Sequence, residues 1–236
     1  MNIVENNYYI KDFKYGKISF LNKKQSIPFF EHYKHNDNYQ EHINIEFKKY
    51  HLSNSNVIDV GANVGLFSVS FSKIDPSCKV HSFEAVKINR TILQNNKILN
   101  GLENLLVYDY GLSDETKESN IIVNDDNLAT CTFSTNCKFP NSRIETINVK
   151  KLDDYNFTNV SFIKVDIQEH EYEFIKGATE TLKNNDATVI LEIPIRNNRE
   201  IEIHNKCKIL MQSLGYGHYR ACINSTKDYI FRKKQF

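Results

Sequence analysis

Hydrophobic residues change their spacing along the chain in a way that alternates strands with helices. The apolar run 57–60 precedes a loop with two glycines, and a helical pattern follows over 66–73. The same order returns with a second strand expected at 79–83 and a helix whose apolar face recurs between 88 and 99. Short apolar runs of this kind are typical of strands buried on both faces. The pattern therefore predicts βαβ units and a mostly parallel sheet.

This alternation continues through the second half of the chain. Helices are expected at 171–182 and 203–214, and Gly215 gives the later helix a glycine C-cap. Further strands are expected at 105–110, 161–165, 188–191, 219–223 and 229–232.

One segment, residues 120–149, interrupts the α/β order. Apolar residues lose their helical spacing there, and Asn, Asp, Ser and Pro residues separate β-like runs at 121–123, 130–133 and 144–149. Polar breaks between short β-like runs predict a β-hairpin insertion.

The first 50 residues have no clean period until Ile43 and Phe47, which recur at helical spacing. We interpret them as an N-terminal cap that leads into a helix. Because no linker or internal repeat divides the chain, we expect one domain over 1–236, with the cap at 1–50 and the core at 51–236.

Composition and charge disfavour several classes of function. The 236 residues carry 30 Lys and Arg against 29 Asp and Glu, a net charge of +1. This balance disfavours nucleic acid as a partner, because a basic field is what attracts polyphosphate. No apolar run approaches the ~18–20 residues of a membrane helix, and the N-terminus lacks the basic and apolar regions of a secretory signal. We therefore expect a cytoplasmic protein without a transmembrane segment.

The cysteines do not indicate a metal or redox centre. They are scattered and form no C-x-x-C pair, so we expect reduced, structural thiols. The histidines other than His170 are likewise expected to be structural. The five cysteines are Cys78, Cys131, Cys137, Cys207 and Cys222.

Acidic residues stand at the ends of four predicted strands. Asp59 ends the first strand within the glycine loop, and Glu84, Asp166 and Glu192 each follow a later strand. In an open parallel sheet, ligands bind beyond the carboxyl ends of the strands. We therefore expect these four carboxylates to surround a ligand site.

The glycine loop favours an adenosine ligand without a pyrophosphate. Gly61 permits a tight turn with backbone N–H groups near a ligand, and Gly65 lets the next helix pack closely. The loop lacks the middle glycine of G-x-G-x-x-G and has no G-K-[ST], which disfavours NAD and ATP. Glu84 stands about twenty residues beyond the loop, where a carboxylate accepts hydrogen bonds from ribose hydroxyls. These features together favour S-adenosylmethionine.

The chain resembles the FkbM family of methyltransferases between about 57 and 192. This resemblance implies the class I methyltransferase fold, a Rossmann-like α/β fold with a seven-stranded, mostly parallel sheet, and O-methylation of sugar or polyketide hydroxyls. It also implies that S-adenosylmethionine is bound by Asp59, Gly61, Asn63, Gly65, Glu84 and Asp166. The motifs that carry the resemblance are D-V-G-A-N-V-G at 59–65, S-F-E-A at 82–85, G-L-S-D at 111–114, K-L-D-D at 151–154, F-I-K-V-D at 162–166, H-E-Y-E at 170–173 and K-G-A at 176–178.

Three positions depart from the family pattern. Gln168 stands where the family has a carboxylate, Glu169 where it has a glycine, and Ala85 where it commonly has a proline. The change at Gln168 removes a candidate acid, and Glu169 adds bulk beside the expected acceptor pocket.

Methyl transfer to a hydroxyl needs a base for the hydroxyl proton. His170 follows Asp166 by four residues and is the expected base, because imidazole titrates near neutral pH. Asp166 is expected to orient the base or hold the acceptor, and Glu192 to face the acceptor. Asp166 and Glu192 could instead present oxygen ligands to Mg²⁺ or Mn²⁺. We favour the metal-free mechanism with His170, because no third carboxylate is clearly placed beside the pair.

The expected partner is a small-molecule or glycan acceptor with a free hydroxyl, and homo-oligomer formation stays open. The leading function is methylation of a sugar hydroxyl in a glycan or glycoconjugate. Two alternatives remain, namely methylation of a polyketide, lipid or protein side chain, and a non-catalytic adenosine-binding scaffold.

Overall fold

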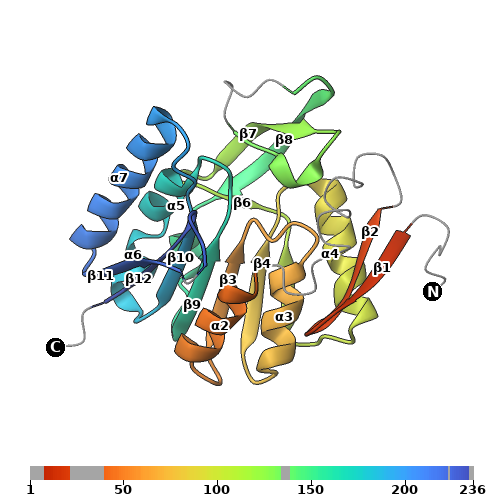
Figure 1. The fold of residues 1–236 in the computed structure, drawn as a ribbon, viewed down its shortest axis with the longest axis horizontal. Helices are drawn as coiled ribbons and strands as arrows, with labels where there is room; N and C mark the ends of the chain where they lie inside the picture. Colours follow the sequence, from red (N-terminus) through yellow and green to blue (C-terminus); the bar gives the residue numbers. More distant parts are fainter. Residues whose placement is uncertain (1–7, 22–39, 134–138, 223, 234–236) are drawn as a thin grey trace.

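The computed structural model describes residues 8–21, 40–133, 139–222 and 224–233. Its centre is a seven-stranded sheet in the order β11-β12-β10-β9-β3-β4-β5 (Figure 1). Strands β5, β4, β3, β9 and β10 are mutually parallel, and β12 is antiparallel to both of its neighbours. The predicted α/β class and mostly parallel sheet are therefore confirmed. The strands are β3 (Asn56–Val60), β4 (Lys79–Phe83), β5 (Leu105–Tyr108), β9 (Val160–Val165), β10 (Thr188–Glu192), β11 (His218–Ala221) and β12 (Asp228–Arg232).

Helices cover both faces of this sheet (Figure 1). Val57 and Ile58 point to opposite faces because strand side chains alternate, and they belong to two separate apolar clusters. The cluster around Val57 includes residues of α2 (Glu41–Tyr50), α3 (Leu66–Ile74) and α4 (Lys87–Leu99). The cluster around Ile58 includes residues of α5 (Glu171–Gly177), α6 (Thr179–Asn184) and α7 (Asn198–Ser213).

The N-terminal part of the described chain contains a hairpin that the hydrophobic pattern did not predict. Strands β1 (Tyr8–Phe13) and β2 (Gly16–Leu21) pair in antiparallel fashion. Asn96 of α4 holds β2 in place, since its Oδ1 accepts a 2.7 Å hydrogen bond from the backbone N–H of Ser19. The helix expected around Ile43 and Phe47 is present as α2.

The β-hairpin insertion is confirmed, with one correction. Strands β7 (Lys117–Asn124) and β8 (Ser142–Lys150) pair in antiparallel fashion, and β6 (Gly111–Leu112) joins them. The strand expected at 130–133 is wrong, because the chain forms a 3₁₀ turn, η3 (Leu128–Thr130), and only Thr132 bridges to Ile122. Asn127 causes this turn, since its side chain accepts a hydrogen bond from the backbone N–H of Ala129.

Two helices also differ from their predicted bounds. The helix expected at 171–182 is divided at Ala178 into α5 and α6. Asp153, in the short helix η4 (Leu152–Tyr155), caps α6 by accepting a hydrogen bond of 2.8 Å from the backbone N–H of Thr181. Helix α7 begins at Asn198, five residues before the expected start, because Asn197 supplies the N-cap.

Within the described ranges, no helix is both long and apolar enough to cross a bilayer.

Candidate active site

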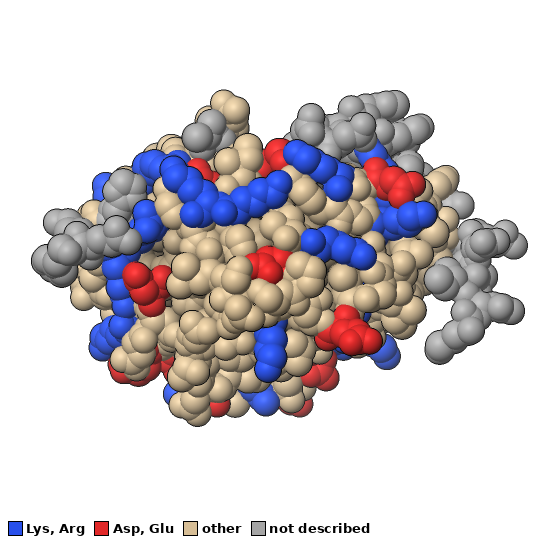
Figure 2. Space-filling model, turned by 90° about the horizontal axis from the view of Figure 1, so that it is seen from below, with Lys and Arg blue, Asp and Glu red and all other residues tan. Residues whose placement is uncertain are grey.

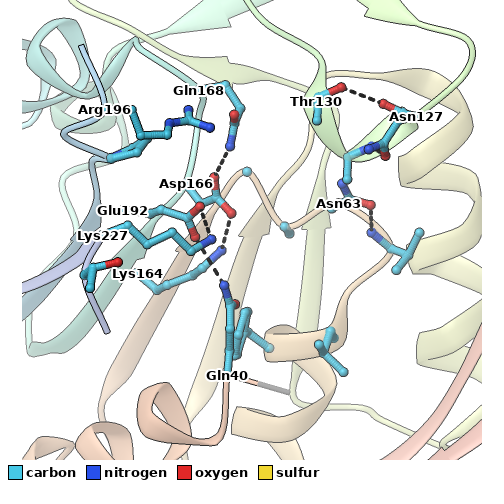
Figure 3. Close-up of a pocket in the computed structure, with 18 of the residues that line it drawn as sticks. Gln40, Asn63, Asn127, Thr130, Lys164, Asp166, Gln168, Glu192, Arg196 and Lys227 are labelled. Atoms are coloured by element: carbon cyan, nitrogen blue, oxygen red, sulfur yellow. Dashed lines mark hydrogen bonds and ion pairs between the residues drawn. The ribbon is translucent and has the colours of Figure 1, made fainter. Parts of the chain in front are cut away.

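Two adjoining cavities open at the carboxyl ends of the central strands, and Figure 3 shows the larger one. The larger has a volume of about 630 Å³ and the smaller a volume of about 70 Å³. The two cavities form one branched site, because residues from the loops after β3 and β9 and from the insertion line both of them. The shared residues are Gly61, Asn63, Ala129, Asp166 and Gln168.

Gly61 is required where the loops after β3 and β9 touch. Its φ is +74°, and a Cβ there would lie 1.9 Å from the carbonyl oxygen of Asp166. Only a residue without a side chain permits this approach. Gly65 has a different role, because its missing Cβ makes room for Leu93 of α4, and it lines neither cavity.

Glu84 joins the end of β4 to the glycine loop. Its carboxylate accepts hydrogen bonds from the backbone N–H groups of Asn63, at 2.8 Å, and Val86, at 2.9 Å. The side chain lines the smaller cavity beside the apolar Phe83 and Leu112. Burial raises the pKa of Glu84 to about 7. A hydrogen-bond donor that enters the cavity would favour the ionised form of Glu84 and lower its pKa.

Lys164 lines the larger cavity and connects two of the expected acids. Its ammonium lies 3.8 Å from the carboxylate of Asp59 and 3.6 Å from that of Asp166. Asp59 is fully buried, accepts a 2.6 Å hydrogen bond from Ser68 and lines neither cavity. Burial alone would lower the pKa of Lys164, but the carboxylates of Asp166 and Asp59 raise it above its usual value. Lys164 therefore stays charged and fixes both acids.

Glu192 faces the larger cavity between two polar partners. Its carboxylate lies 2.5 Å from the ammonium of Lys227, and Gln40 donates a 3.4 Å hydrogen bond to it. Figure 3 shows Glu192, Asp166 and the two lysines gathered on one wall of the cavity. Burial raises the pKa of Glu192 to about 7, and the charge of Asp166 acts in the same direction.

His170 lies outside the lining of both cavities. Its Nε2 is 2.9 Å from the hydroxyl of Ser113, and its ring stacks on Phe133 at 4.2 Å. Phe133 lines the smaller cavity, so His170 lies behind the ring of a lining residue. Burial lowers the pKa of His170.

The loop after β9 has an unusual backbone. Gln168 and Glu169 adopt positive φ angles of 50° and 73°, a region that glycine occupies more easily. Glu169 is held there by an ion pair with Arg199 at 2.8 Å. Gln168 donates a 2.8 Å hydrogen bond to Asp166, and its carbonyl accepts one from Thr132 of the insertion. This loop thus ties the insertion to the strand end that carries Asp166.

The charges around Asp166 and Glu192 do not fit a divalent metal. Each carboxylate already faces an ammonium group, Lys164 at 3.6 Å and Lys227 at 2.5 Å. A divalent cation placed between these carboxylates would be repelled by both lysines.

Gly61, Asn63, Glu84, Asp166 and Glu192, which the sequence placed at the carboxyl edge of the sheet, all line the two cavities there. The sequence did not assign Lys164, Lys227, Gln40 or the η3 turn. A signal for Lys164 was present, because it is a lone charge inside an apolar run of the fully buried type. Lys227 and Gln40 have no such signal, since they reach the site from segments far away in the chain.

Two comparisons with known sequences differ in outcome. A family model described as the methyltransferase FkbM domain matches residues 59–217. A search of curated proteins found no matching sequence.

Several solved structures share the fold. A methyltransferase FkbM from Methylobacillus flagellatus aligns with a TM-score of 0.50 and 15% identity, over 87% of this chain and 58% of that chain. A SAM-dependent O-methyltransferase from Thermotoga maritima aligns with a TM-score of 0.50 and 11% identity, over 98% and 79% of the two chains. A precorrin-6y C5,15-methyltransferase from Geobacter metallireducens aligns with a TM-score of 0.52 and 15% identity, over 83% and 89%. At these identities the likeness concerns the fold, and the present chain spans 58% of the length of the FkbM structure.

Proposed function

We propose, on the premise that this chain belongs to the FkbM methyltransferase family, that it transfers a methyl group from S-adenosylmethionine to a sugar hydroxyl in a glycan or glycoconjugate. The observation that carries the proposal is the branched site, in which a cavity with a buried acid adjoins a larger, polar cavity. The acid is Glu84, which we propose as the ligand of the ribose hydroxyls.

The smaller cavity offers contacts to the nucleoside part of the cofactor, which would extend from it into the larger cavity, because about 70 Å³ is less than a nucleoside occupies. Each Glu84 oxygen accepts one backbone hydrogen bond, from Asn63 or Val86. A carboxylate oxygen has two lone pairs, so each can accept one more, as a ribose diol requires. Phe83 and Leu112 supply the apolar walls that a purine needs. Bound S-adenosylmethionine would supply an electrophilic methyl group on a sulfonium.

The larger cavity fits an uncharged acceptor with several hydroxyls. Gln40, Asn127 and Gln168 offer amide donors and acceptors there. The charged groups are paired, Lys227 with Glu192 and Arg196 with Glu200, so the lining has no large excess of one sign. A sugar ring matches such a lining better than a lipid chain does, because buried polar groups need hydrogen-bond partners.

Two residues compete for the role of the base. We favour Glu192, because it lines the acceptor cavity and burial brings its pKa to about 7, close to the ideal value for proton transfer at neutral pH. Asp166 and Gln40 would hold the acceptor beside it. His170 is the competing base and would have to turn away from Ser113 and Phe133 to reach a substrate.

The methyl-transfer experiment described below also tests acceptors other than sugars. The solved neighbours include methyltransferases whose names specify oxygen or carbon positions, so the fold leaves the acceptor atom open. On the face drawn in Figure 2, Lys and Arg side chains gather in a band across the upper half of the view, so RNA is kept among the acceptors to be tested.

The decisive experiment incubates the chain with labelled S-adenosylmethionine and separate panels of glycosides, polyketide alcohols, lipids, peptides and RNA. We expect label in the glycoside panel, at hydroxyl oxygen. Label in another panel would replace the acceptor class, and binding of the cofactor without label in any panel would favour the scaffold alternative. The Glu84→Gln variant is the control for transfer that depends on this site.

A further inference from the structure

A second cluster of ligating side chains lies at the edge of the sheet opposite the two cavities. Among the described residues, His51, Asp75 and Cys78 are the group of His, Cys, Asp or Glu side chains that could hold a metal ion, with their donor atoms all within 4.8 Å of one another. His51 ends α2, Asp75 ends α3 and Cys78 immediately precedes β4. We propose that these three residues form a structural Zn²⁺ site.

The ring of His51 is fixed in the orientation of a metal ligand. Its Nδ1 lies 2.7 Å from the backbone carbonyl of Phe47, and the ring stacks on the Phe47 side chain at 4.2 Å. A carbonyl only accepts hydrogen bonds, so Nδ1 carries the proton and Nε2 offers its lone pair. A backbone carbonyl bound to the second ring nitrogen is the usual support of a zinc-bound histidine.

Nε2 of His51 then faces a second acceptor. It lies 3.1 Å from Oδ2 of Asp75, and in the neutral ring these two atoms are both lone-pair donors. A shared cation, or an additional ring proton, relieves the repulsion between them. Asp75 is itself fixed, because its Oδ1 accepts hydrogen bonds from the backbone N–H and the hydroxyl of Ser77, at 3.0 and 2.6 Å.

Cys78 provides the third donor and determines the type of metal. Its buried side chain now donates a weak hydrogen bond of 3.3 Å to the carbonyl of Leu52. On coordination the sulfur would release its proton to solvent and form a bond to the metal. One imidazole, one carboxylate and one thiolate, with a water molecule as the fourth ligand, suit tetrahedral Zn²⁺ and disfavour Mg²⁺ and Ca²⁺. Tetrahedral Zn²⁺ separates its ligand atoms by about 3.3–3.8 Å, so small side-chain shifts would close the site.

The position of the cluster points to a structural role. It joins the end of α2 to the turn between α3 and β4, at the amino ends of β3 and β4, whereas the cavities lie at their carboxyl ends. Zinc would therefore stabilise the fold and leave the affinity for S-adenosylmethionine unchanged. This inference does not depend on the proposed function.

The test uses Co²⁺ as a spectroscopic substitute for Zn²⁺ in the full chain after treatment with a chelator. We expect visible absorption bands of tetrahedral Co²⁺ and a thiolate-to-cobalt charge-transfer band in the near ultraviolet. Cys78→Ser should abolish the charge-transfer band, and His51→Gln should weaken Co²⁺ binding by about 10-fold or more. Cys207→Ser, which removes another buried thiol, is the matched control and should keep both bands.

A second measurement needs no variant. Zn²⁺ should raise the thermal unfolding midpoint of the chelator-treated wild-type chain, and Mg²⁺ should not. The proposal is overturned if Co²⁺ gives no thiolate band, if the band persists in Cys78→Ser, or if Zn²⁺ leaves the midpoint unchanged. In that case His51 and Asp75 form an imidazolium–carboxylate pair only.

Discussion

The carboxylate of Glu84 accepts a 2.8 Å hydrogen bond from the backbone N–H of Asn63, which joins the end of β4 to the glycine loop after β3. A second bond, from Val86, fixes the other carboxylate oxygen. The acid is thus oriented before any ligand arrives, and only the remaining lone pairs are available for binding. Under the proposed function, Glu84 would be the side chain that discriminates an adenosyl ligand.

Replacing Glu84 by Gln should weaken S-adenosylmethionine binding by ~1.5–3 kcal/mol, because charge-assisted hydrogen bonds to the ribose are lost. Since burial raises the pKa of Glu84 to about 7 and ribose donors favour the ionised form, wild-type affinity should increase between about pH 6 and 8. Calorimetry across this range measures both effects. The exposed Glu103→Gln is the control, and an affinity of Glu84→Gln equal to wild type would remove Glu84 from the site.

Glu192→Gln should lower kcat by ~10²–10⁴ and leave cofactor affinity nearly unchanged, because a positioned base contributes about this factor. His170→Gln should lower kcat by less than about 10-fold, since His170 lies behind Phe133. Single-turnover methyl transfer with both variants measures the two effects. The reverse ranking would restore His170 as the base.

Lys227→Met should move the rising limb of the pH–rate profile to higher pH by about one unit or more. Lys227 lowers the pKa of Glu192, which burial and Asp166 raise, so loss of the ammonium leaves Glu192 protonated at higher pH. The profile of kcat between about pH 5.5 and 9 is the measurement. Lys227→Arg keeps the cation and should keep the wild-type profile. Identical profiles for Lys227→Met and the wild type would show that Lys227 does not influence the pKa of the base.

Gly61→Ala should destabilise the fold by ~2–4 kcal/mol, because the positive φ is strained and the new Cβ would lie 1.9 Å from a backbone oxygen. Gly101→Ala is the matched control. Gly101 also has a positive φ, but nothing lies within 4 Å of the added Cβ, so only the strain of ~1–2 kcal/mol remains. Denaturant unfolding compares the two variants, and equal losses would contradict the contact between the two loops.

Glu171 links stability to pH. Burial raises its pKa to about 8, above its ordinary value, so its contribution to stability is complete at low pH and is lost as pH rises through about 8. Glu171→Gln stays neutral and should unfold with a smaller decline in free energy between about pH 6 and 9, by ~1–3 kcal/mol. Urea unfolding at several pH values gives the slopes. If the slope of Glu171→Gln equals that of the Glu103→Gln control, Glu171 is ionised in the native state.

The strands and their acidic ends could be predicted because they depend on local sequence. The segments before Gly61, Glu84, Asp166 and Glu192 are rich in apolar residues, and a parallel sheet places all their carboxyl ends at one edge. The role of the loop glycines could also be predicted, because a tight turn between a strand and a helix requires glycine. The β1–β2 hairpin was missed because it gains its packing from Asn96 and the rest of α4 rather than from a clear period of its own.

The sequence did not predict in which direction the side chains of the site point. His170 occupies the expected position after Asp166, yet its ring stacks on Phe133, from the insertion, and lines neither cavity. Lys227 meets Glu192 only because β12 pairs with β10, and Gln40 reaches the same carboxylate from the start of α2. His51 and Cys78 likewise meet across two helix ends.

The sequence by itself therefore determined the fold class, the family resemblance and the edge of the sheet where a cofactor would bind. Only the tertiary structure decided which side chains face the cavities, which cations neutralise Asp166 and Glu192, and which thiol lies beside an imidazole. The physical reason is that strand and loop signals arise from neighbouring residues, whereas the pairing of charges and the direction of a ring depend on contacts between distant segments.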